Sequence, residues 1–247
     1  MPSTVPYSRA FYADIEDGAR LSAQEVAPVL IDMLQPRNVV DVGCGNGAWL
    51  SVFKELGIKN ILGIDGSYVE PQTLRIAPEE FLPMDLQRPG AINNIFDLVL
   101  SLEVAEHLPR ECANDYLDLL TSLGDVIAFS AAIPNQGGTG HVNEQWPEYW
   151  KTLFEARGFR LVDCLRGRFW NNRNIERWYR QNLVLYVQEN RLRASPDLLR
   201  EQQNSAAPML ALVHPATYTS PSLSSLLHML PGTLKRALRR RWQKIVR

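Results

Sequence analysis

Three glycines at alternate positions follow a short apolar run near residue 40. The segment VVDVGCGNGAW spans residues 39–49 and places Gly43, Gly45 and Gly47 between a strand-like stretch and a helix-like stretch. Glycine allows a tight turn and lets the backbone approach a ligand closely. In open α/β sheets the first turn between a strand and a helix is the usual ligand contact. The segment therefore predicts a small-molecule site, of a kind that several nucleotide-binding families share.

Carboxylates accompany the ends of the first three predicted strands. Asp41 precedes the first glycine by two residues, where it would be a poor neighbour for a pyrophosphate and a good one for an ammonium or sulfonium group. Asp65 ends the second predicted strand, the position of an acid that binds ribose hydroxyls. Asp85 ends the third, within MDL at residues 84–86, and suits the amino group of an adenine.

Proton-transfer chemistry is suggested by two histidines in predicted loops. His107 lies in FDLVLSLEVAEHLP, residues 96–109, together with Glu103 and Glu106. The pKa of a free imidazole, about 6.5, would let a neutral His107 take a proton from a substrate hydroxyl. The alternative is that His107 hydrogen-bonds the following helix and only shapes the pocket.

His141 lies in the loop NQGGTGHVNEQW, after the fifth predicted strand. His141, Asn143, Glu144 and Trp146 could bind a hydroxyl-rich acceptor, with the indole stacked on a ring. The alternative is a lid that bonds only to itself.

Alternating strands and helices must position these residues. Hydrophobic periodicity predicts helices at 22–35 (with Ser22 as N-cap), 48–57, 112–124 and 147–158, and strands at 38–43, 60–66, 79–86, 95–103, 125–133, 159–166 and 181–189. Only irregular sequence separates the last two strands, which favours an antiparallel pair. We therefore expect an α/β, doubly wound (Rossmann-like), mostly parallel seven-stranded sheet with an antiparallel last strand and a C-terminal extension.

Three regions follow from the composition along the 247 residues. Residues 1–190 form the predicted core domain, 191–222 a Pro- and Ser-rich linker or extension, and 223–247 a basic tail. Seven of the 26 Lys and Arg residues fall in 235–247, which hold no acid, so the preceding residues carry 19 basic against 27 acidic groups. Leu234, Leu238, Trp242 and Ile245 share one face of a predicted amphipathic helix. Such a helix would lie on an anionic membrane, or dock on the protein's own acidic body or on a partner.

Several classes of function are disfavoured. No apolar run is long enough for a membrane span, and no secretory signal precedes the first helix. Three cysteines without CxxC spacing argue against a disulfide framework or a zinc site, so we expect no metal. FWNNRNIERWYRQN, residues 169–182, mixes arginines with aromatics, but the acidic body disfavours nucleic acid as a partner. We expect a cytoplasmic protein, and the membrane-binding alternative for the tail would place it at the inner face of the membrane.

Together the segments VVDVGCGNG, ILGIDGS, LPMDL and FDLVLSLEVAEHLP resemble a class I S-adenosylmethionine-dependent methyltransferase over residues 20–188. The later stretch SAAIPNQGGTGHVNEQWPEYWKTLFEARGF resembles a group of bacterial methyltransferases that often have no assigned substrate. The resemblance implies S-adenosylmethionine as cofactor. It also implies the cofactor contacts, which are Asp41, Gly43, Gly45, Asp65, Asp85, Leu86 and, in the acidic loop, Glu103.

The expected function is methyl transfer to a nucleophile, oxygen above all, on a small molecule or glycan, with His107 and His141 as candidate catalytic residues. One alternative is a non-catalytic subunit of the same fold that binds cofactor or scaffolds a partner. Another is nicotinamide-dependent oxidoreduction, which rests on the glycine pattern alone.

Overall fold

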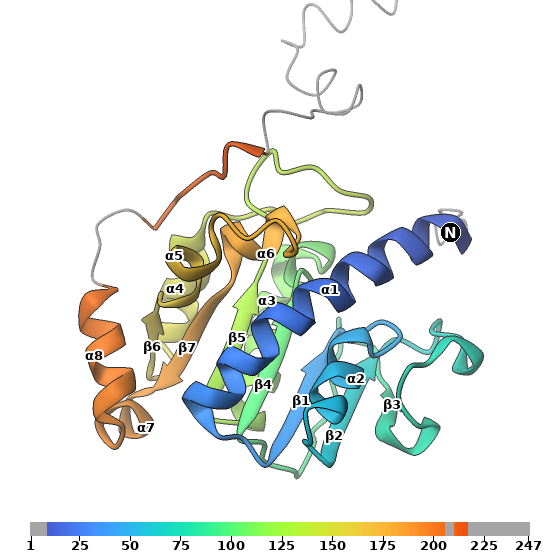
Figure 1. The fold of residues 1–247 in the computed structure, drawn as a ribbon, viewed down its shortest axis with the longest axis horizontal. Coiled ribbons are helices and arrows are strands. Elements are labelled where there is room, and N and C mark those ends of the chain that lie inside the picture. Colours follow the sequence, from blue (N-terminus) through green and yellow to red (C-terminus); the bar gives the residue numbers. More distant parts are fainter. Residues whose placement is uncertain (1–8, 206–209, 217–247) are drawn as a thin grey trace, which may run out of the picture.

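A single seven-stranded sheet organises the chain. The computed structural model describes residues 9–205 and 210–216. The strands are β1 (Asn38–Val42), β2 (Asn60–Asp65), β3 (Phe81–Pro83), β4 (Leu98–Leu102), β5 (Val126–Ser130), β6 (Phe159–Val162) and β7 (Val184–Gln188). Their order is β3-β2-β1-β4-β5-β7-β6 (Figure 1). β7 runs antiparallel to both neighbours and the other pairs are parallel, which confirms the predicted fold class.

Helices cover both faces of the sheet. They are α1 (Arg9–Leu34), α2 (Ala48–Glu55), α3 (Ala113–Leu123), α4 (Pro147–Glu155), α5 (Leu165–Phe169), α6 (Arg177–Asn182), α7 (Glu189–Arg193) and α8 (Pro196–Asn204). Alternate side chains of each strand enter different cores: Val39 packs with α1 and α2, whereas Val40 packs with α3 and α4. The two layers of helices can be followed in Figure 1.

The sheet register brings the predicted site segments to one edge. Asp41 pairs with Gly63 of β2 and with Leu100 of β4, so the carboxyl ends of β1, β2 and β4 lie together. The strand order reverses between β1 and β4, where an open α/β sheet leaves a crevice for ligands. The loops after these strands therefore form the candidate site.

The first helix starts earlier than its sequence signals indicate. α1 begins at Arg9, so the prediction of Ser22 as N-cap is wrong. The Ser22 hydroxyl instead donates to the Gly18 carbonyl at 2.6 Å and accepts from the Glu176 amide at 2.9 Å. A serine within a helix can bond backward to the preceding turn in this way.

Short helices occupy two stretches that were expected to be irregular. Between β6 and β7 the chain forms α5 and α6, which bury Phe169 and Tyr179 against the sheet. After β7, α7 and α8 bury Leu192 and Leu198, and the Ser195 side chain caps α8. Part of the predicted linker at 191–222 is thus helical and packed. The division into three regions stays a prediction, and the basic tail at 223–247 lies outside the described residues.

Across residues 9–205 and 210–216, no helix combines the length and apolar character that crossing a membrane requires.

Candidate functional site

The glycine loop leaves β1 with left-handed backbone. Gly43 has φ of 86°, and a Cβ there would lie 2.3 Å from the Val104 Cγ2 atom, so only glycine fits between the loop and the turn after β4. Gly45 has φ of 54°, and a Cβ built on it meets no atom within 4 Å. The loop is therefore closed against the protein at Gly43 and open to an incoming group at Gly45.

Asp65 fastens this loop to the end of β2. Its carboxylate accepts hydrogen bonds from the Gly45 amide at 2.7 Å, the Gly66 amide at 2.6 Å and the Tyr68 hydroxyl. The residue is only 4% exposed, whereas Tyr68 is 76% exposed. A carboxylate offers about four lone-pair positions, so the Tyr68 hydroxyl marks one that a ligand hydroxyl can take.

Asp41 is a second buried acid beside the loop. It is 2% exposed, and burial followed by repulsion from Asp65 raises its pKa to about 8. Two carboxylates at the carboxyl edge create a site that favours positive charge. A cationic ligand bound there would favour the ionised form of Asp41 and lower its pKa.

The third strand brings Asp85 and Leu86 next to β2. The Met84 amide donates to the Asp65 carbonyl at 2.7 Å, which ties the end of β3 to the acid of β2. Asp85 is exposed and one of its oxygens accepts from the Gln87 amide at 2.9 Å. Leu86 is buried in the core on the α3 side. Asp85 thus has a free face toward solvent at the edge where a ligand would lie.

Glu103 follows β4 in a strained backbone conformation. Its φ is 56°, uncommon outside glycine and frequent at functional sites. The carboxylate accepts from Gln136 at 2.8 Å and from Asn182 at 3.1 Å. Burial raises its pKa, while these amide donors oppose that shift. Glu103 is therefore fixed by side chains from the loop after β5 and from α6.

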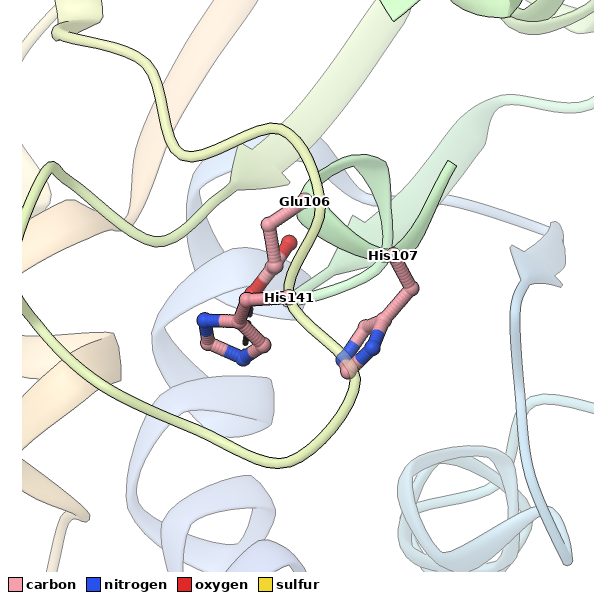
Figure 2. Close-up of side chains that lie close together, drawn as sticks. All are labelled: Glu106, His107 and His141. Atoms are coloured by element: carbon pink, nitrogen blue, oxygen red, sulfur yellow. Dashed lines mark ion pairs between the residues drawn. The ribbon is translucent and has the colours of Figure 1, made fainter. Parts of the chain in front are cut away.

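Glu106, His107 and His141 form a cluster beside Glu103 (Figure 2). The Glu106 side chain is fully buried. The backbone amides of Glu106 and Ala132 lie near its carboxylate, but within the described residues neither oxygen meets the geometry of a hydrogen bond. Burial, and then repulsion from Glu103, raises the Glu106 pKa well above its ordinary value. The His107 and His141 rings meet edge to face with centroids 4.8 Å apart.

The two histidines differ in their surroundings. The pKa of His107 is lowered to about 4, first by desolvation and then by the neighbouring His141. Solvent reaches the exposed His107 ring and moderates both effects, but each favours the neutral imidazole. The Nδ1 atom of His141 lies 2.9 Å from the Glu144 carboxylate, which orients this ring. Its Nε2 atom faces Glu106 at 4.0 Å.

Hydrogen bonds tie the loop after β5 to itself and to the turn that carries Glu106. Glu144 accepts from the backbone amides of Asn135 and Gly137 at 2.8 and 3.1 Å. The amides of Val142 and Asn143 both donate to the Glu106 carbonyl, at 2.9 and 3.0 Å. The loop is therefore self-bonded, as one interpretation of the sequence holds, and it also carries His141 to the site.

Predicted acceptor contacts occupy different environments in this loop. Asn143 is buried and its amide nitrogen has no partner among the described residues, whereas Trp146 is 42% exposed. Sequence reasoning did not single out Gln136, Asn182 or Tyr68, which complete the polar surroundings. Asn182 lies 79 positions from Glu103, and no local pattern indicates such a contact.

Comparisons with known proteins agree with this arrangement. Residues 16–128 match the family described as a methyltransferase domain. The ribosomal RNA large subunit methyltransferase E of Caulobacter vibrioides is 36% identical over 107 residues, which cover 40% of this chain and 45% of that protein. The chain thus spans less than half the length of this curated relative.

Two solved structures share the fold at low identity. The magnesium protoporphyrin IX methyltransferase of Synechocystis, with bound S-adenosylmethionine, is 18% identical with a TM-score of 0.50, covering 75% of this chain and 86% of that one. DesVI of Streptomyces venezuelae is 13% identical with a TM-score of 0.51, covering 74% and 100%. Residues 16–128, which carry the glycine loop, Asp65 and the Glu106 turn, therefore match a methyltransferase-domain family, and the chain shares the fold of these two solved structures.

Proposed function

We propose that this protein transfers the methyl group of S-adenosylmethionine to an oxygen nucleophile on a small molecule or glycan. The observation that carries the proposal is the pair of buried carboxylates, Asp41 and Asp65, around a glycine loop that is open at Gly45. A cofactor that carries both a sulfonium and an ammonium group matches that charge.

The residues present fit this cofactor. Asp65 would accept from the ribose hydroxyls in place of the Tyr68 hydroxyl, and Gly45 gives the backbone room for close approach. Asp41 would favour the positive charge of the methionine end. Asp85 and Leu86, in the turn that follows β3, would take the adenine, and Glu103 follows β4, on the other side of β1 in the sheet.

The protein's residues have two chemical tasks, to position the acceptor and to remove its proton. The methyl carbon moves from the sulfonium sulfur to the acceptor oxygen, S-adenosylhomocysteine leaves, and the acceptor's proton must be removed. Holding the acceptor in line with the methyl carbon can contribute about 7–11 kcal/mol. His141, oriented by Glu144, and His107, whose environment favours the neutral imidazole, are the proposed proton acceptors.

A second candidate acceptor is RNA, because the Caulobacter relative is a ribosomal RNA methyltransferase. The overall charge favours the first candidate. The residues before 235 carry 27 acidic against 19 basic groups, and this excess of negative charge would repel a phosphate backbone. A role as a non-catalytic cofactor-binding subunit remains the third possibility, and it predicts binding without turnover.

Methyl-labelled S-adenosylmethionine tests these candidates together. The full chain is incubated with the label and a cell extract, and S-adenosylhomocysteine and labelled products are quantified. Our proposal predicts S-adenosylhomocysteine formation that depends on extract, and label in a fraction resistant to ribonuclease. Label released by ribonuclease would establish the RNA acceptor, and tight binding without any S-adenosylhomocysteine would favour the non-catalytic role. Asp32→Asn, an exposed change on α1, serves as the control and should behave as wild type.

A further inference from the structure

We propose that Glu106, His107 and His141 bind one divalent transition-metal ion at the acceptor side of the site. Each side chain offers one donor atom, and the three donors lie within 4.8 Å of one another. Figure 2 shows the three side chains converging from the turn after β4 and from the loop after β5. Metal binding itself is independent of the proposed methyl transfer, whereas the ion's role in catalysis rests on it.

The donor atoms are too far apart to bond to one another and close enough to share one ion. The His141 Nε2 atom and the Glu106 Oε1 atom are 4.0 Å apart, too far for a hydrogen bond. Ligands about 2.0–2.1 Å from a tetrahedral ion stand roughly 3.4 Å apart. Closing the widest separation, 4.8 Å, to this spacing takes a movement of roughly 0.7 Å by each of two side chains, which rotation about their torsions can supply.

Glu106 provides an independent argument. Its carboxylate is fully buried, and the nearby amides of Glu106 and Ala132 do not reach hydrogen-bond geometry with either oxygen in the described part of the chain. Leaving such a group unpaired is costly, because buried polar groups are normally satisfied and buried charges are paired or coordinate metals. A bound cation would supply the missing partner.

The surroundings of His141 resemble those of metal-binding histidines. Such histidines usually donate their other ring nitrogen to a carboxylate, which fixes the tautomer and the ring orientation. The His141 Nδ1 atom is paired in this way with Glu144, and Glu144 is itself held by the amides of Asn135 and Gly137. This leaves Nε2 as the donor to an ion.

The backbone holds the two halves of the site together. The amides of Val142 and Asn143 donate to the carbonyl of Glu106, so the segment that carries His141 is bonded to the segment that carries Glu106 and His107. Gly138 also contributes, because a Cβ there would lie 2.1 Å from the His141 Nε2 atom. A side chain at residue 138 would therefore displace the His141 ring.

The donor set selects the kind of ion. Two imidazoles and one carboxylate suit zinc, cobalt, manganese or iron, whereas magnesium and calcium prefer oxygen ligands alone. Three protein ligands leave a coordination position open, where an acceptor hydroxyl could bind and lose its proton more readily. The expectation of no metal from the sequence rested only on the spacing of the cysteines. The proposed ligands lie on the turn after β4 and on the loop after β5, so no single motif contains them.

Cobalt binding to the metal-stripped full chain tests the site, because Co²⁺ has visible absorption that reports its ligands. We expect one Co²⁺ per chain, displaced by Zn²⁺. His141→Gln and Glu106→Gln should each weaken binding by more than about 100-fold, and Glu144→Gln by about 10- to 100-fold. Gly138→Ala keeps every donor but displaces the His141 ring, so it should also weaken binding.

His214→Gln is the matched control. Both ring nitrogens of His214 are already engaged, by the Trp170 carbonyl and the Ala216 amide, so this variant should bind Co²⁺ as the wild type does. Circular dichroism identifies any variant that fails to fold. If Glu106→Gln does not fold, the His141→Gln variant still tests the site, because His141 lies at its edge. A wild-type chain that binds no Co²⁺ at millimolar concentration, or variants that bind it unchanged, would overturn the proposal. Titration of the same samples with S-adenosylmethionine separates this failure from a failure of the proposed function.

Discussion

At the scale of single residues, the site is a concentration of buried carboxylates with different partners. Asp65 is satisfied by two backbone amides and a phenol and Glu103 by two side-chain amides, whereas Glu106 has only nearby amides outside hydrogen-bond geometry among the described residues. The positions of Asp41 and Asp65 could be predicted because they follow a local motif at strand ends. The amide partners of Glu103 could not, since Gln136 and Asn182 approach it only through the fold.

Asp41 should make stability depend on pH. Its pKa is about 8 in the folded state, so between about pH 4 and pH 8 the folded state keeps a proton that the unfolded state loses. The free energy of unfolding should therefore fall as pH rises through this window. Asp41→Asn removes this pH-dependent contribution to stability. The difference between the melting temperatures of the variant and the wild type should therefore shift in favour of the variant from pH 5 to pH 8. Thermal melts at both values check this, with Asp32→Asn as control, and parallel pH curves would contradict it.

Tyr68 should compete with the cofactor for Asp65. Its hydroxyl bonds to the carboxylate that the ribose is proposed to use. Tyr68→Phe removes this competitor, whose bond to the carboxylate contributes only about 0.5–1 kcal/mol because Tyr68 is 76% exposed and water competes for it, so affinity for S-adenosylmethionine should rise about two- to fivefold. Calorimetric titration measures the change. Weaker binding by the variant would mean that Tyr68 supports the ligand.

At the scale of elements, loops from distant parts of the chain complete the site. Strand and helix periodicity predicted β1 to β7 and α2 to α4, because each of these elements has a regular apolar face. The short helices α5 to α8 were missed, since five to nine residues carry little periodicity and their burial depends on the sheet beneath. The contact of α6 with Glu103 was therefore missed as well.

Two glycines of the same loop should respond differently to alanine. Gly43→Ala combines left-handed strain with a Cβ clash against Val104, so we expect a loss of about 2–4 kcal/mol in unfolding free energy. Gly45→Ala adds a Cβ in open space and should cost only about 1–2 kcal/mol from strain, while weakening cofactor binding. Urea unfolding and ligand titration of both variants provide the comparison. Equal stability losses would argue against the close contact at Val104.

At the scale of the whole molecule, charge is distributed unevenly. Residues 223–247, outside the described part, are predicted to form a basic amphipathic helix beside an acidic body. If it contacts anionic membranes, each Lys or Arg near the surface contributes about 1 kcal/mol. Co-sedimentation with anionic vesicles should then weaken as salt rises and disappear on truncation after Ser222. A full chain that ignores such vesicles at low salt would exclude this role, and loss of folding on truncation would instead indicate docking on the body.

The central claim, that the glycine loop and its acids bind S-adenosylmethionine, is tested most directly by isothermal titration of the full chain with that cofactor. We predict one saturable site per chain. Asp65→Ala should reduce the affinity about tenfold to a hundredfold while leaving the fold intact, because a hydrogen bond to a charged group contributes about 1.5–3 kcal/mol. Asp32→Asn should bind as wild type. A folded wild-type chain that gives no binding heat at several temperatures, or an Asp65→Ala variant with unchanged affinity, would contradict the account.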